Sequence, residues 1–122
     1  MLGYTKTEVK LEMIEVLDYC IAPSICFLKD QSIKERGLTG FDCNKYLCKT
    51  KNLTGVLREV LKQYDSKSVR NAVLELYTLL DNVNITIVNY YFDDSFTNGS
   101  TLCSNLEAVK IKVLELLVML ND

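Results

Sequence analysis

The spacing of apolar residues between positions 53 and 64 constrains the fold of this chain more than any other feature. Apolar side chains recur there at steps of three and four residues, at Leu53, Val56, Leu57, Val60, Leu61 and Tyr64. Because an α-helix turns once every 3.6 residues, this spacing places them all on one side of a helix. We therefore predict an amphipathic helix over residues 53–64.

A similar pattern predicts a helix over residues 5–22. Thr5 and Glu8 have the capping-box spacing, in which a hydroxyl and a glutamate satisfy free amides at a helix start. The apolar stripe continues to Cys20, and Pro23 lacks the amide that an uninterrupted helix needs. We expect the segment after Pro23 to be buried despite a bend.

Helical spacing resumes over residues 68–91, although its last part is ambiguous. Residues 84–92 are rich in β-branched and aromatic side chains, which also favour a strand. A single strand would have nothing to pair with, so we favour a helix to about Tyr91.

The C-terminal segment, residues 105–121, carries two apolar stripes. One contains Val113 and Leu116, and the other contains Ile111, Leu114 and Val118. A helix that is apolar on two sides is usually wrapped by its neighbours, so we predict this helix at the centre of the structure. We also predict a short helix over 32–37 and an irregular, lysine-rich connection over 43–52.

These segments predict an all-α fold in one domain, residues 1–122. The chain has 48% hydrophobic and 25% charged residues and one proline, a composition typical of globular proteins. We expect a compact bundle of four to five helices, with the C-terminal helix central. The helices are predicted near 5–22, 32–37, 53–64, 68–91 and 105–121.

The sequence argues against most catalytic chemistry. The chain has no histidine, which removes histidine-based nucleophile activation and histidine metal ligands. Glycine-rich phosphate-binding motifs are also missing from the sequence. Its five cysteines include no C-x-x-C pair, so a zinc site is disfavoured. We expect a protein without catalytic activity, cofactor or metal, with Cys43 and Cys48 reduced rather than joined by a disulfide.

Charge is distributed unevenly along this small acidic protein, whose net charge is −2. Residues 29–70 carry ten Lys or Arg against five Asp or Glu, a net charge of +5. Such a segment can form an internally compensated surface or attract an acidic protein or a nucleic acid. The candidate partner-binding residues are Lys45, Lys49, Lys51, Arg58, Lys62, Lys67 and Arg70.

The N-terminal residues alternate between charged and apolar, unlike a signal peptide, and no segment is apolar enough to span a membrane. We therefore expect a small cytoplasmic, regulatory, inhibitory or host-interacting module that binds another protein. Nucleic-acid binding is one alternative. The other is a secreted, glycosylated signalling protein whose leader has been removed, because N-x-[ST] sequons begin at Asn52, Asn84 and Asn98.

Overall fold

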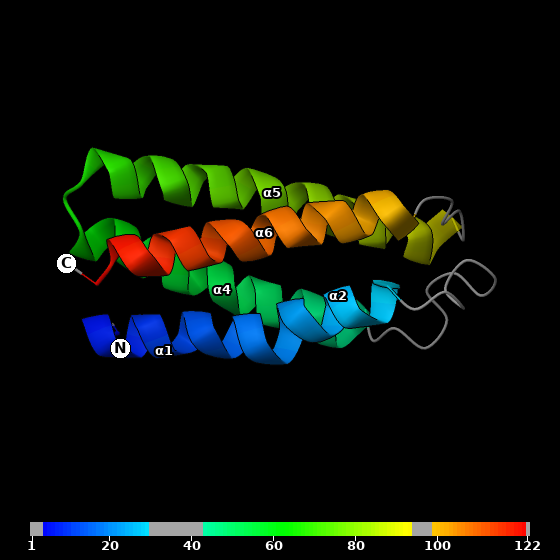
Figure 1. Cartoon of the computed structure of the whole chain (residues 1–122), viewed down its shortest axis with the longest axis horizontal. Coiled ribbons are helices and arrows are strands. Elements are labelled where there is room, and N and C mark those ends of the chain that lie inside the picture. Colours follow the sequence, from blue (N-terminus) through cyan, green and yellow to red (C-terminus); the bar gives the residue numbers. More distant parts are fainter. Residues whose placement is uncertain (1–3, 30–42, 94–98, 122) are drawn as a thin grey trace.

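The computed structural model describes residues 4–29, 43–93 and 99–121. These residues form long helices that pack as a compact bundle with alternating directions (Figure 1). The first consists of α1 (Lys6–Val16), a π-helical turn η1 (Leu17–Ile21) and α2 (Ala22–Lys29). The others are α4 (Cys43–Gln63), α5 (Lys67–Asp93) and α6 (Gly99–Met119). The predicted all-α bundle is confirmed, whereas the predicted helix 32–37 lies outside the described residues.

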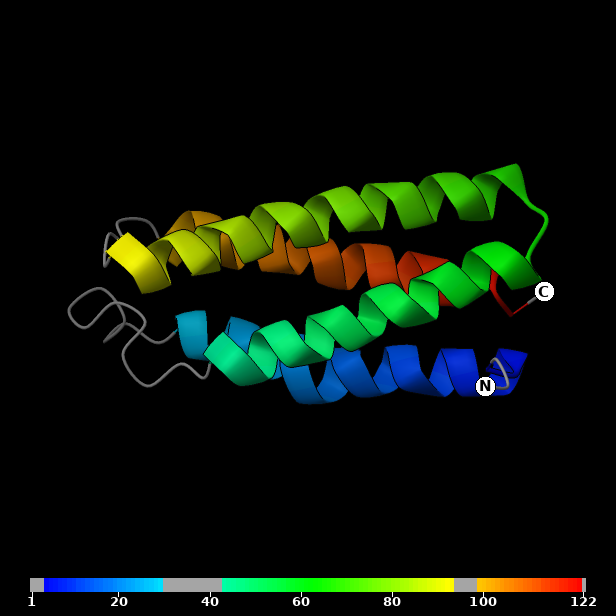
Figure 2. The same ribbon diagram turned by 180° about the vertical axis from the view of Figure 1, so that it is seen from behind.

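The helices surround one apolar core, and each long helix packs on two neighbours. The α1–η1–α2 helix contacts α4 on one side and α6 on the other, and α5 also lies between α4 and α6. Figure 2 shows α4 and α5 from behind, running side by side from their short connection. The face formed by α4 and α5 is therefore opposite the face formed by α1 and α6.

The first helix begins as predicted but continues through Pro23. The Thr5 hydroxyl accepts a hydrogen bond from the Glu8 amide at 3.1 Å, and the Glu8 carboxylate accepts one from the Thr5 amide at 3.3 Å. These bonds confirm the capping box. The prediction that the helix ends near residue 22 is wrong, because the π-helical turn precedes the proline and the helix extends to Lys29.

The π-helical turn keeps one side of this helix facing the core. Buried residues recur every four positions, at Val16, Cys20, Ser24 and Leu28. Over the twelve residues from Val16 to Leu28, a regular α-helix would turn the last side chain roughly 120° away from the first. The extra residue of a π turn offsets about 100° of that rotation. The Ser24 hydroxyl also donates to the Cys20 carbonyl at 2.7 Å, within the turn beside the proline.

Two other helix starts differ from the prediction. Helix α4 begins at Cys43, so residues 43–52 are helical and the predicted irregular connection is wrong. The buried Cys43, Tyr46 and Thr50 extend the apolar stripe backwards from Leu53. Helix α6 begins at Gly99 rather than 105, and its buried Leu102 belongs to the core. In both segments, burial of side chains in the core stabilises the helix although the neighbouring residues are polar.

The ambiguous segment 84–92 is helical, as favoured, because α5 continues to Asp93. The central position predicted for the C-terminal helix is wrong. Its Val113 and Leu116 are fully buried, but its second stripe, Ile111, Leu114 and Val118, is exposed. Helix α6 is thus one of the outer members of the bundle, with one side open.

Candidate protein-binding surface

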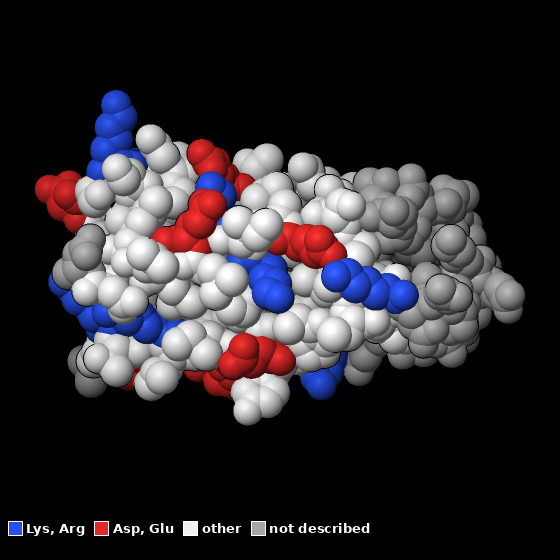
Figure 3. Space-filling model, in the orientation of Figure 1, with Lys and Arg blue, Asp and Glu red and all other residues white. Residues whose placement is uncertain are grey.

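Helices α1 and α6 together expose five large aliphatic side chains. We call this set the α1–α6 apolar face; it consists of Leu11, Ile14, Ile111, Leu114 and Val118. Val118 is 70% exposed and Leu11 is 60% exposed, so neither contributes much to the core. In Figure 3, uncharged atoms cover much of the described surface over these two helices, with charged groups between them.

Helix spacing and helix packing decide which of the five residues lie near one another. Ile111, Leu114 and Val118 are separated by three and four residues, which places them on the same side of α6. On α1, Ile14 lies towards α6, whereas Leu11 is seven residues before Asp18 and lies on the outer side of the helix. Since α1 contacts α6, the line along which the two helices meet runs beside Ile14 and Leu114, and we call this line the groove.

Contacts near both ends fix how α1–η1–α2 and α6 align. Near the chain termini, the Lys6 ammonium lies 4.8 Å from the centre of the Tyr64 ring, and the Tyr64 hydroxyl donates to the Leu120 carbonyl at 3.4 Å. Towards the other end, Lys29 pairs with Glu107 at 3.0 Å. The two helices run antiparallel, so the first turns of α1 lie near the C-terminal end of α6 (Figure 1).

The sides of the two helices that meet in the groove are identified by their ion pairs. On α1, Glu15 faces α4, where it pairs with Lys49 at 3.8 Å. The opposite side, with Lys10, Ile14 and Leu17, therefore faces α6. On α6, Lys112 faces α5, where it pairs with Glu75 at 2.6 Å.

A third ion pair between helices, between Lys29 and Glu107, shows which side of α6 faces the first helix. Lys110, Leu114 and Leu117 follow Glu107 on that side at helical spacing. The pairing with Lys29 raises the pKa of that ammonium and lowers the pKa of the Glu107 carboxyl, mainly through their hydrogen bond. Both groups are thus held in their charged forms by each other.

The basic residues singled out in the sequence do not form one surface. Lys45 and Lys49 lie on the side of α4 that faces α1, close enough to Cys20 to favour its thiolate. Arg58 instead lies beside the Tyr77 hydroxyl of α5, and Lys62 follows it by four residues. The exposed members on the α4–α5 side are Lys51, Arg58, Lys62, Lys67 and Arg70.

None of the five cysteines, all within the described residues, is part of a disulfide. Burial raises the pKa of Cys20 to about 11, against the smaller opposing effects of Lys45 and Lys49. Burial, followed by the Glu107 carboxylate, also raises the pKa of Cys103. Both thiols are therefore poor nucleophiles at neutral pH.

Helical geometry rules out a disulfide between Cys43 and Cys48. Five residues of α-helix advance roughly 7.5 Å, whereas bridged residues usually have Cα atoms within about 7 Å of each other. Cys43 is also buried while Cys48 is exposed, so their side chains point in different directions.

The sequons differ in their accessibility. Asn52 is exposed within α4, whereas the side-chain oxygen of Asn84 is buried in α5. Asn98 lies outside the described residues. Within the described ranges no cluster of three or more Cys, Asp or Glu is arranged to hold a metal, and no helix there has the length and apolarity to cross a membrane.

Comparison with known proteins adds no relative. No family model matches the chain, and neither the curated proteins nor the solved structures contain a significant match. The assignment of the α1–α6 apolar face as a candidate binding surface therefore depends on its structure alone.

Sequence reasoning missed this face, although its signal was present. The second stripe of residues 105–121 was noticed and assigned to the core. Exposed Leu11 and Ile14 lie beside a buried stripe of Val9, Met13 and Val16, so α1 is also apolar beyond its core-facing side. A sequence predicts an exposed apolar surface when two of its helices each carry more apolar residues than their core-facing sides can hold.

Proposed function

We propose that this protein is a small, non-catalytic helical module that binds another protein through the α1–α6 apolar face. The observation that carries the proposal is the exposure of five aliphatic residues on two adjacent helices. Single exposed apolar residues are common on protein surfaces, but contiguous apolar patches usually mark interaction sites. Binding a partner would remove this surface from water, and such burial is the main favourable contribution to protein association.

Two other exposed aliphatic residues help to define the surface. Leu74 and Ile85 are on α5, eleven residues apart, and α5 does not contact α1 extensively. They lie on α5 rather than on α1 or α6, so they serve as internal controls. Ile85 and Ile111 form a matched pair, because they are 58% and 57% exposed and have the same side chain.

A regulatory or inhibitory role in the cytoplasm, including interaction with a host protein, agrees with the thiol chemistry. Five free cysteines suit a reducing compartment, and the helical placement of Cys43 and Cys48 argues against the secreted alternative. The lack of histidine and the raised pKa values of Cys20 and Cys103 support the non-catalytic part of the proposal.

The experiment compares tagged wild-type protein with the Ile111→Glu and Ile85→Glu variants, each expressed in cells of the natural source. Partners are quantified by mass spectrometry and then titrated as purified proteins by calorimetry. We expect one partner to bind wild type and Ile85→Glu equally, and Ile111→Glu at least about tenfold more weakly. Equal binding to the two variants, with circular dichroism showing both folded, would contradict the proposal.

A second candidate function is binding of a nucleic acid or an acidic partner on the α4–α5 face. The favouring observation is that Arg58, Lys62 and Arg70 lie near the connection between these helices, where Lys67 begins α5. Lys67 and Arg70 have no ion pair with any described residue, and Lys62 pairs only with its own neighbour Glu59, at 3.5 Å.

A further inference from the structure

We propose that the partner recognised by the α1–α6 apolar face is an acidic amphipathic helix. This inference rests on the proposed function and specifies the chemistry of its partner. The helix would lie along the groove between α1 and α6, with its apolar side on Ile14 and Leu114 and its carboxylates on Lys10 and Lys110.

The first argument is the shape of the apolar surface. Exposed aliphatic side chains on two adjacent helices suit a partner helix, whose apolar residues recur at three and four residue steps. The segments that carry most of them, 10–17 of α1 and 110–117 of α6, each advance roughly 10 Å, which corresponds to about two helical turns. A partner helix of three to five turns would cover this length.

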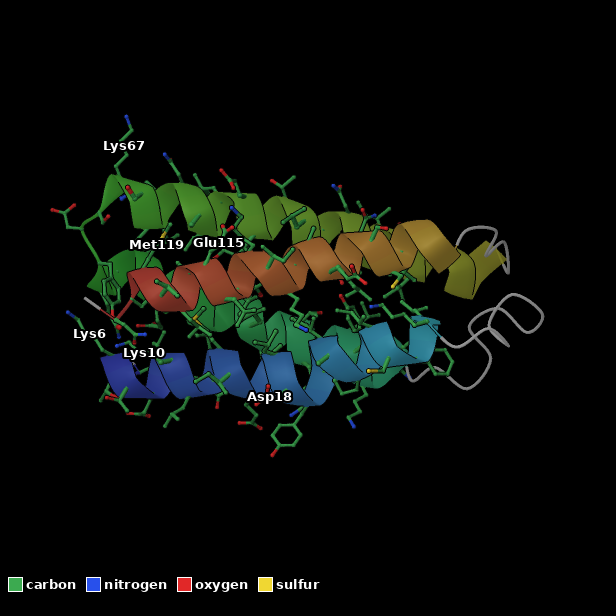
Figure 4. All side chains as sticks on the ribbon, in the orientation of Figure 1. Lys6, Lys10, Asp18, Lys67, Glu115 and Met119 are labelled. Atoms are coloured by element: carbon green, nitrogen blue, oxygen red, sulfur yellow. The ribbon has the colours of Figure 1, made fainter. Side chains whose placement is uncertain are left out.

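The second argument is the charge inside the groove. Lys10 is half-buried on the α6-facing side of α1, and Lys110 is exposed on the α1-facing side of α6. Neither ammonium has an ion pair with a residue in the described parts of the chain. In Figure 4, Lys10 extends from α1 towards the C-terminal end of α6, where Met119 lies.

The positions of the two lysines also fix the spacing of the carboxylates that they would bind. Each lysine is seven residues before a leucine of its own groove segment, Leu17 or Leu117. Because the segments run antiparallel, Lys10 and Lys110 lie at opposite ends of the groove. The partner helix therefore needs acidic residues about two turns apart, with apolar residues between them.

Four acidic residues of these helices, in α1, η1 and α6, form no ion pair with either lysine. Glu15 is turned towards α4 by Lys49, and Asp18 points away from α6 (Figure 4). Glu107 pairs with Lys29 at 3.0 Å, although the charge of Lys110 also contributes to lowering the pKa of its carboxyl, and Glu115 lies towards α5 near Lys112, with which it pairs at 3.0 Å. A second copy of this chain is a poorer occupant, because the same lysines would face each other across a two-fold axis.

The test uses fluorescent peptides of about 18 residues that share leucines at helical spacing and differ only in their flanking charges, Glu or Lys. Binding is measured by anisotropy to wild type, to Lys10→Glu with Lys110→Glu, and to the matched control Arg58→Glu with Lys62→Glu. Both double variants change the net charge equally.

We expect wild type and the control to prefer the Glu peptide by at least about tenfold, against the protein's net negative charge, and the Lys10/Lys110 variant to prefer the Lys peptide. Leu114→Glu should weaken binding of both peptides. A preference that survives the Lys10/Lys110 reversal, or failure of the Glu peptide to bind, would overturn the inference. The cellular comparison of Ile111→Glu with Ile85→Glu would still decide the proposed function separately.

Discussion

Leu114 and Leu116 are two residues apart on α6, yet their environments are opposite. Leu116 is fully buried, whereas Leu114 is 44% exposed on the α1–α6 apolar face. Replacing each leucine therefore tests a different property. A change at Leu116 tests the stability of the core, and the same change at Leu114 tests the exposed surface. The comparison cancels differences in helix propensity, because both residues would be replaced in the same way.

We predict that Leu116→Ala lowers the free energy of unfolding by about 2–5 kcal/mol, because it leaves a cavity in a packed core. Leu114→Ala should cost less, about 1 kcal/mol, since Leu114 is 44% exposed and its removal leaves no closed cavity. Urea denaturation followed by circular dichroism measures both. A similar decrease in the free energy of unfolding for the two variants would mean that the side of α6 with Leu114 is not the exposed side.

Helix α4 shows how far the properties of one element could be predicted from sequence. Its second half, 53–64, was predicted from a clean apolar stripe, and the observed helix ends one residue earlier, at Gln63. Its first half was missed because the stripe passes through Thr50, a polar residue that is nevertheless fully buried. The Thr50 hydroxyl donates to the Leu47 carbonyl at 3.1 Å, so the helix itself satisfies the polar group.

Gly55 is a weak point within this helix. It lies in the middle of α4, and a Cβ atom built there would meet nothing within 4 Å. We predict that Gly55→Ala raises the free energy of unfolding by about 0.5–1 kcal/mol, because alanine loses less backbone entropy in a helix. Thermal denaturation provides the measurement. No change, or a loss of stability, would show that the site is more crowded than described.

At the scale of the whole molecule, folding redistributes charges that are continuous in sequence. The basic segment 29–70 was predicted to form either an internally compensated surface or a partner-binding surface, because its lysines and arginines are close along the chain. The helical rotation of α4 sends Lys45 and Lys49 towards α1, while Arg58 is turned towards α5. The sequence correctly predicted an all-α bundle, but it did not determine which side of the bundle each charged residue faces.

The nucleic-acid alternative has a test that uses the same variants. If the α4–α5 face binds RNA or DNA, affinity should fall steeply with salt as counterions are released. The double variant Arg58→Glu with Lys62→Glu should abolish binding of a labelled oligonucleotide, and Lys10→Glu with Lys110→Glu should leave it nearly unchanged. Filter binding at several salt concentrations measures this. If both variants reduce the binding of the oligonucleotide equally, the binding reflects only non-specific attraction between the nucleic acid and positive charges on the protein.

The π-helical turn before Pro23 makes this part of the chain sensitive to insertions and deletions. Removing one residue between Leu17 and Ile21 would restore a regular helix and rotate α2 by about 100° relative to α1. Ile25 and Leu28 would then leave the core if Val9 and Met13 stayed in it. The number of residues in this turn is therefore constrained as strictly as the identity of any core side chain.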